Sequence, residues 1–150
     1  MTSIATVGYE GATVESFLAA LRDAGVELVV DVRAVTSSRR PGFSKRQLAA
    51  ELERVGIDYL HLRGLGTPAE GRAAARAGRH AEMRRVFLEH LRTPEAQEAL
   101  TELEEVLERG RRIALLCYEA DAAHCHRSII ASGIEERHGA TVQHLTPRLP

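Results

Sequence analysis

Four helical patterns in this 150-residue chain each end at a glycine, and an apolar or β-branched run begins within a few residues of it. The glycines are Gly25, Gly56, Gly110 and Gly139. Glycine often ends a helix because it adopts the left-handed conformation without strain. Strands that alternate with helices are joined by right-handed crossovers and form a mainly parallel sheet. We therefore expect an α/β fold, a three-layer sandwich with a central sheet.

The expected sheet has about five strands, with helices on both faces. The strands are predicted at residues 3–7, 26–32, 57–61, 113–117 and 140–145. Ser44 and Gln47 fit the capping-box pattern at the start of the second helix. Residues 63–79 contain four glycines and are expected to form a long excursion, with a short helix over residues 73–76. Excursions of this length in a compact domain are often binding loops or lids.

Length and composition limit the class of protein. The length favours a single domain over residues 1–150. No signal-peptide pattern is present at the N-terminus, and no apolar run approaches the roughly 20 residues of a membrane span. We therefore expect a cytoplasmic protein that does not bind membranes and whose two cysteines form no structural disulfide. Composition gives no indication of the oligomeric state.

The charge of the chain is unevenly distributed. Residues 33–92 hold 13 Lys and Arg against 6 Asp and Glu, although the whole chain has a formal net charge of −1. A basic segment of this kind attracts anionic ligands, or it forms a solvated helical face. A small anionic ligand or a nucleotide is therefore the expected partner.

Reactive side chains concentrate between residues 117 and 127, where both cysteines and two of the seven histidines lie. In open α/β sheets, ligands bind where strands end and helices begin. Loops that follow parallel strands share one edge of the sheet, so we predict a site there. We expect Glu10, Asp31, Cys125 and His126 to be catalytic, Arg33, Arg39, Arg40 and Arg127 to bind an anion, and Tyr9, His61, Cys117 and Glu119 to line the pocket.

Several motifs resemble one known family. They are Gly8-Tyr9-Glu10-Gly11, Asp31-Val32-Arg33, residues 38–45 and 56–61, Leu65-Gly66, Cys117-Tyr118-Glu119 and Cys125-His126-Arg127. Together they resemble the bacterial and archaeal family catalogued as domain of unknown function 488 (DUF488). The family usually has a proline after Asp-Val-Arg, where this chain has Val35-Thr36, and often a second glycine after Leu-Gly, where it has Thr67. The resemblance implies an α/β prokaryotic domain and a site, but no assigned reaction.

One interpretation of the site is anion-binding catalysis. Cys125 is expected near a helix N-terminus, where the dipole, His126 and Arg127 would lower the pKa of the thiol. The same N–H groups and Arg127 would hold a phosphate or carboxylate, as in a hydrolase or transferase with an anionic substrate. Cys-dependent phosphatases and rhodaneses also combine a cysteine-containing loop, an arginine and a helix N-terminus, but with a longer spacing between cysteine and arginine. The structural alternative is that Cys117 is simply a small buried residue that ends a strand.

A second interpretation is a metal site. The potential ligands are Cys117, Glu119, His124, Cys125 and His126, and cysteine with histidine suits zinc or iron. The usual spacings, such as C-x-x-C, are absent, and Cys125 and His126 are neighbours. The sequence therefore assigns no metal ligand and leaves the cofactor unknown, with a Cys/His metal-binding protein as an alternative.

A third interpretation is a binding module without catalysis. Arg33, Arg39 and Arg40 lie beside the expected edge of the sheet, and phosphate contacts need only such side chains. Nucleic acid is therefore a candidate partner, although aromatic side chains for base stacking are few and the chain has no tryptophan.

Overall fold

A computed structural model, which describes residues 2–147, contains one five-stranded parallel sheet. The strands are β1 (Ser3–Gly8), β2 (Leu28–Asp31), β3 (Asp58–His61), β4 (Ile113–Cys117) and β5 (Thr141–Leu145). Their order is β3-β2-β4-β1-β5, and every neighbouring pair is parallel. The predicted α/β fold is therefore confirmed, and the strand order, which the sequence did not provide, places β4 at the centre.

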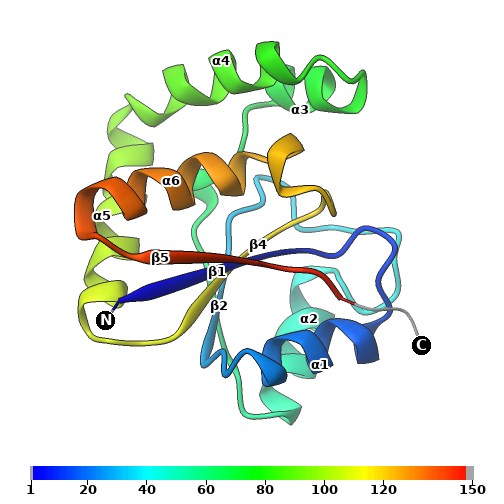
Figure 1. Ribbon diagram of the computed structural model, residues 1–150. Coiled ribbons are helices and arrows are strands. Elements are labelled where there is room, and N and C mark those ends of the chain that lie inside the picture. The colour runs from blue at the N-terminus through cyan, green and yellow to red at the C-terminus, as the bar shows by residue number, and fades with distance from the viewer. Residues whose placement is uncertain (1, 148–150) are drawn as a thin grey trace.

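Helices cover both faces of the sheet, as expected (Figure 1). Helices α1 and α2 lie on one side, and α3, α4, α5 and α6 lie on the other. The bounds are α1 (Val14–Asp23), α2 (Lys45–Arg54), α3 (Ala69–Arg76), α4 (His80–Leu91), α5 (Pro94–Glu108) and α6 (His126–His138), with 3₁₀ helices at Arg63–Leu65 and Ala122–His124. Within residues 2–147, none of the helices is both long and apolar enough to cross a membrane.

The central strand β4 is buried on both faces because its side chains alternate between two cores. Ile113 and Leu115 belong to the core under α3–α6, and Ala114 and Leu116 belong to the core under α1 and α2. Side chains of a strand point alternately to opposite faces, so a strand with helices on both sides must be apolar throughout. This explains the uninterrupted apolar run that was recognised in the sequence.

Most predicted element ends agree with the structure. The four glycines predicted to end helices all have a positive φ, between 65° and 80°. The predicted excursion contains α3, which begins at Ala69 and is longer than the short helix expected over residues 73–76.

The capping box predicted at Ser44 is wrong. The Ser44 side chain makes no cap hydrogen bond, because its hydroxyl accepts from the Ser38 backbone N–H at 2.9 Å and donates to the Ser38 carbonyl at 3.2 Å. A capping box is present instead at Thr13, whose side chain accepts from the Ser16 N–H. A loop contact has thus taken the hydroxyl that the pattern assigned to the helix.

Two glycines let backbone segments approach closely at the C-terminal edge of the sheet. A Cβ atom on Gly8 would lie 1.7 Å from the Glu119 carbonyl oxygen, and one on Gly66 would lie 2.4 Å from the Ala34 nitrogen. Both obstacles are backbone atoms, so no side-chain rotation can relieve the overlap. Gly8 therefore allows the loop after β4 to lie against the end of β1.

We expect Gly8→Ala to lower the free energy of unfolding by about 1–3 kcal/mol or more, the usual cost of overpacking. Gly133→Ala is the matched control, because a Cβ there would meet only the flexible Arg137 guanidinium, at 3.1 Å. That change should cost nothing or stabilise α6 by up to about 1 kcal/mol. Urea unfolding of both variants is the measurement, and equal stabilities would contradict the proposed close approach.

Candidate functional site

A small cavity of about 110 Å³ lies at the C-terminal edge of the sheet. Parallel pairing aligns the strand ends there, with Gly8 beside Cys117 and Asp31 beside both Leu116 and His61. Five residues predicted for the site line the cavity: Tyr9, Arg33, Cys117, Glu119 and His126. The loops after β1, β2 and β4 therefore meet at one place, as the topology requires.

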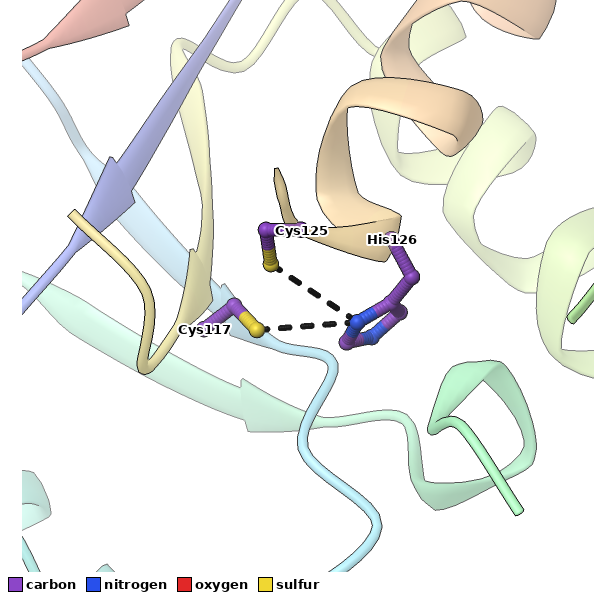
Figure 2. Close-up of side chains that lie close together, drawn as sticks. All are labelled: Cys117, Cys125 and His126. Carbon is purple, nitrogen blue, oxygen red and sulfur yellow. Dashed lines mark hydrogen bonds between the residues drawn. The ribbon is translucent and has the colours of Figure 1, made fainter. Parts of the chain in front are cut away.

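Two cysteines and a histidine form a compact buried cluster beside this cavity. Cys117 ends β4, Cys125 is the N-cap of α6, and His126 is the first residue of that helix. The 3₁₀ turn Ala122–His124 folds the loop back, so that the three side chains point toward one another (Figure 2). The Cys117 Sγ atom lies 3.5 Å and the Cys125 Sγ atom 3.7 Å from His126 Nδ1.

The orientation of His126 is fixed by its other ring nitrogen. His126 Nε2 lies 2.8 Å from the Val32 carbonyl oxygen, which can only accept, so this nitrogen carries the proton. In the neutral ring Nδ1 then presents its lone pair to both sulfur atoms. A backbone carbonyl that holds one ring nitrogen while the other faces ligand-type atoms is the arrangement found around metal-binding histidines.

The two thiols differ in acidity. Burial alone would raise the pKa of Cys125, but the hydrogen bond with Cys117 and the positive charges of His126 and Arg127 hold it well below the ordinary value. For Cys117, burial and the neighbouring Cys125 raise the pKa well above that value. Burial would lower the pKa of His126, yet the Cys125 thiolate raises it. The ion-free cluster therefore favours a thiolate at Cys125 and a protonated thiol at Cys117.

Glu119 links this cluster to the cavity. The Cys117 thiol donates to Glu119 Oε2, with 3.1 Å between the sulfur and oxygen atoms. Burial, followed by the negative charge of Cys125, raises the pKa of the Glu119 carboxyl group. Because Glu119 also lines the cavity, it is the acidic group best placed to exchange a proton with a molecule bound there.

Arg127 has a structural contact pattern that the sequence did not predict. Its side chain is fully buried, and it donates to the carbonyl oxygens of Glu119 at 2.6 Å and Ala120 at 3.3 Å. Its Nε atom has no hydrogen-bond partner among the described residues. Arg127 is not one of the residues that line the cavity, so its guanidinium fastens the loop after β4 to α6.

Asp31 and Arg33 form a buried ion pair at the end of β2. Arg33 donates to both carboxylate oxygens, at 2.9 and 2.8 Å, and Tyr59 donates to Asp31 Oδ2 at 2.5 Å. The remaining contacts of the guanidinium are with the Tyr9 hydroxyl and the Phe43 carbonyl. Burial, then the Asp31 charge, raises the pKa of Tyr59. Four donor contacts of the Arg33 guanidinium are thus made within the protein, and Asp31 accepts two of them.

The other predicted site residues do not line the cavity. The Glu10 carboxylate accepts from the Ala120 N–H at 3.0 Å, Arg40 donates to the Ala12 carbonyl, and His61 Nε2 donates to the Arg33 carbonyl at 2.8 Å. Arg39 is exposed. These contacts stabilise the loops after β1, β2 and β4.

Sequence reasoning missed several residues that line the cavity: Thr67, Arg72, Met83, Tyr118 and His124. The first two lie in the glycine-rich excursion, and Met83 lies on α4. The length of that excursion was the available signal, because it indicated a binding loop, but it did not indicate which side chain would face the site.

Fold and site together define a class: an α/β protein with an all-parallel sheet and a buried Cys/His cluster at the C-terminal edge of that sheet. The model of the family described as domain of unknown function DUF488 matches residues 13–134, so the chain belongs to this family. Comparison with curated proteins and with solved structures found no match. The matched range includes the cluster and the cavity-lining residues from Arg33 to His126.

We expect Asp31→Asn to lower the free energy of unfolding by about 3–5 kcal/mol, because it leaves the buried Arg33 guanidinium without its counter-charge. The matched control is Asp58→Asn. Asp58 pairs with Arg111 at 2.8 Å, but it is 68% exposed, and such pairs contribute less than about 1 kcal/mol. Chemical denaturation of both variants is the measurement. Similar decreases in the free energy of unfolding would show that the buried ion pair contributes no more to stability than the exposed one.

The difference in acidity between the thiols predicts one thiolate in the reduced, ion-free protein at neutral pH. Because the folded pKa of Cys125 lies below its unfolded value, this thiolate stabilises the fold above the unfolded pKa. That stabilisation is lost as the pH falls through the folded pKa. Ultraviolet thiolate absorbance against pH is the measurement. Cys125→Ser should remove the signal that persists below the ordinary cysteine range, and its persistence in that variant would refute the assignment.

Proposed function

We propose that this chain is a metal-dependent hydrolase in which Cys117, Cys125 and His126 hold one zinc ion, or a divalent ion with similar ligand preferences. The observation that carries the proposal is the convergence of three ligand atoms, which all lie within 4.8 Å of one another. The proposal takes up the second interpretation of the sequence, a metal site, for which no ligand was assigned from the sequence itself. Adjacent residues can share an ion here because the helix begins between them, and Cys125 keeps an extended backbone while His126 is helical.

The distances between the ligand atoms fit a bound ion. In a tetrahedral zinc site, bonds of about 2.3 Å to sulfur and about 2.0–2.1 Å to nitrogen separate the two ligand atoms by about 3.5 Å. The separations from Cys117 Sγ and Cys125 Sγ to His126 Nδ1 are 3.5 and 3.7 Å. One ion placed between the three atoms would therefore lie within bonding distance of both sulfur atoms and of the nitrogen.

The surroundings also favour a bound cation with thiolate ligands. The Val32 carbonyl fixes the orientation of the His126 ring. In other proteins, contacts of this kind raise metal affinity by about 10- to 100-fold. Arg127 is a fully buried cation beside Cys125 and has no carboxylate partner among the described residues. A buried charge needs an opposite charge nearby, and thiolate ligands would supply it.

Glu119 and the cavity support a catalytic rather than a structural ion. Three protein ligands leave the fourth position open to water or substrate, which is typical of catalytic zinc sites. An ion at such a position supplies activation of water at neutral pH. Glu119 borders the cavity beside Cys117, so it would be placed to take a proton from water and return it to a leaving group.

Nucleophilic catalysis by a cysteine has less support. The thiol with the lowered pKa, Cys125, is only 1% exposed and does not line the cavity. The thiol that lines the cavity, Cys117, has a raised pKa. A reactive cysteine must be both ionised and accessible, and neither thiol is both.

The nucleic-acid alternative gains no specific support either. The notable aromatic side chains near the C-terminal edge of the sheet are Tyr9, Phe43, Tyr59 and Tyr118. Of these, Tyr9 and Phe43 are buried and stack on each other with ring centroids 4.5 Å apart. Their faces are therefore used inside the protein.

Titration of the reduced protein with Co²⁺ and Zn²⁺ tests the proposed ion. We expect one ion per chain, thiolate-to-cobalt absorption of a tetrahedral site, and displacement of cobalt by zinc. Cys117→Ser, Cys125→Ser and His126→Gln should each lower the affinity by more than about 100-fold, because each removes a direct ligand rather than a supporting contact. Glu119→Gln should retain the ion and lose hydrolytic turnover.

His124→Gln is the matched control, because His124 borders the same cavity but is not part of the three-atom group. The affinity of the His124→Gln variant for Co²⁺ and Zn²⁺ should equal that of the unmodified protein. Circular dichroism and thermal unfolding verify that each variant is folded. Absence of binding at micromolar ion, or equal binding by both serine variants and the unmodified protein, would reject the proposed function.

A further inference from the structure

The cavity beside the cluster has an apolar wall, and one of its arginines, Arg72, has no acidic partner among the described residues. Ala75 and Met83 supply apolar surface, and Thr67 and Arg72 supply polar groups from the excursion between β3 and α4. Its volume of about 110 Å³ is well below the roughly 300–1,000 Å³ of pockets that hold drug-sized molecules. The cavity therefore suits a ligand of a few heavy atoms.

Arg72 is the guanidinium of this cavity that is not committed to an acidic partner. Arg33 also lines the cavity, but it forms a buried ion pair with Asp31 and donates to both of its carboxylate oxygens. Arg72 donates from Nη1 to the Thr67 carbonyl at 2.9 Å, and it forms no ion pair within the described part of the chain. A guanidinium has five N–H groups, so Arg72 keeps donors for a ligand.

The backbone positions Arg72 firmly. A Cβ atom on the preceding residue, Gly71, would lie 2.5 Å from Thr67 Cγ2 and 3.1 Å from Val86 Cγ1. Glycine at this position therefore lets α3 pack closely against α4 and against the segment that carries Thr67. The hydrogen bond with the Thr67 carbonyl then holds the guanidinium at the cavity, which reduces the entropy lost when a ligand binds.

The charged groups that line the cavity differ in their partners. Arg33 is paired with the buried Asp31 carboxylate, so these two charges cancel each other. Glu119 also lines the cavity, where it accepts from the Cys117 thiol. Arg72 is the arginine of the cavity lining that has no acidic partner among the described residues.

We infer that Arg72 makes the cavity a binding site for a small oxyanion, a carboxylate or a phosphate group, and so determines the substrate class of the proposed hydrolase. This inference rests on the proposed function. The oxyanion would accept from Arg72, and the rest of the substrate would face the ion and Glu119. Anion binding is thereby assigned to Arg72 and not to the four arginines that the sequence suggested. Of those four, Arg33 is paired with Asp31, and Arg39, Arg40 and Arg127 do not line the cavity.

The inference is tested by titrating the cobalt-loaded protein with acetate and with inorganic phosphate, which distinguish the two oxyanions, and with acetamide as the neutral analogue of acetate. We expect one or both anions, but not acetamide, to change the cobalt spectrum. Arg72→Gln should weaken anion binding by about 10- to 100-fold, the worth of a charged hydrogen bond. Arg72→Lys should recover part of this loss, because it restores the charge.

Arg76→Gln is the matched control, since it removes the same charge from an exposed position one turn further along α3. Its anion affinity should remain within about twofold of the unmodified protein, because solvent and salt screen an exposed charge. Equal losses in the Arg72 and Arg76 variants, or no loss in the Arg72 variant, would overturn the inference.

Failure of the proposed function has a different signature. A protein that binds no cobalt contradicts the metal site, and the anion titration is then followed by backbone amide chemical shifts of Thr67 and Cys117 in the ion-free protein. Shifts that depend on Arg72 would retain the oxyanion site without the metal, and absence of shifts would reject both proposals. Retained cobalt binding without an effect of Arg72→Gln rejects the oxyanion inference alone.

Discussion

The site depends on the buried guanidinium of Arg127, which binds two successive carbonyl groups of the loop after β4. These contacts draw the loop toward the first turn of α6, and that proximity brings Cys117 against Cys125 and His126. Gly8 is also needed for this loop position, because the absence of a side chain leaves room for the Glu119 carbonyl against the end of β1. Arg127, which has no carboxylate partner within residues 2–147, thus shapes the backbone and also favours negative charge on the neighbouring sulfur of Cys125.

The fold was accessible from the sequence because its signals are local and repeated. Apolar runs such as residues 113–117 and the glycines that end helices mark the elements directly. Strand order was not accessible, since it depends on long-range pairing such as that of β1 with β4. The Ser44 pattern failed for a related reason: a loop residue, Ser38, competes for the hydroxyl, and no local pattern records that competition.

The sequence indicated the edge of the sheet at which the cavity lies, but not every side chain that lines it. Tyr9, Arg33, Cys117, Glu119 and His126 line the cavity because parallel strands deliver their loops to one edge. The convergence of Cys125 with Cys117 could not be inferred from an eight-residue separation, because it requires the 3₁₀ turn between them. Arg72 was overlooked since the register of α3, which turns its side chain toward the cavity, depends on how closely Gly71 packs.

The strand order has a consequence for how this protein reaches its native state. The first strand, β1, pairs only with β4 and β5 among the described strands, and the first of these partners begins at Ile113. Synthesis from the N-terminus therefore exposes an apolar strand with unpaired backbone groups until most of the chain has been made. Pairing across such a long separation is slow and open to aggregation. Cys117 ends the same late strand, and Cys125 and His126 follow it, so the cluster can assemble only after this interval as well.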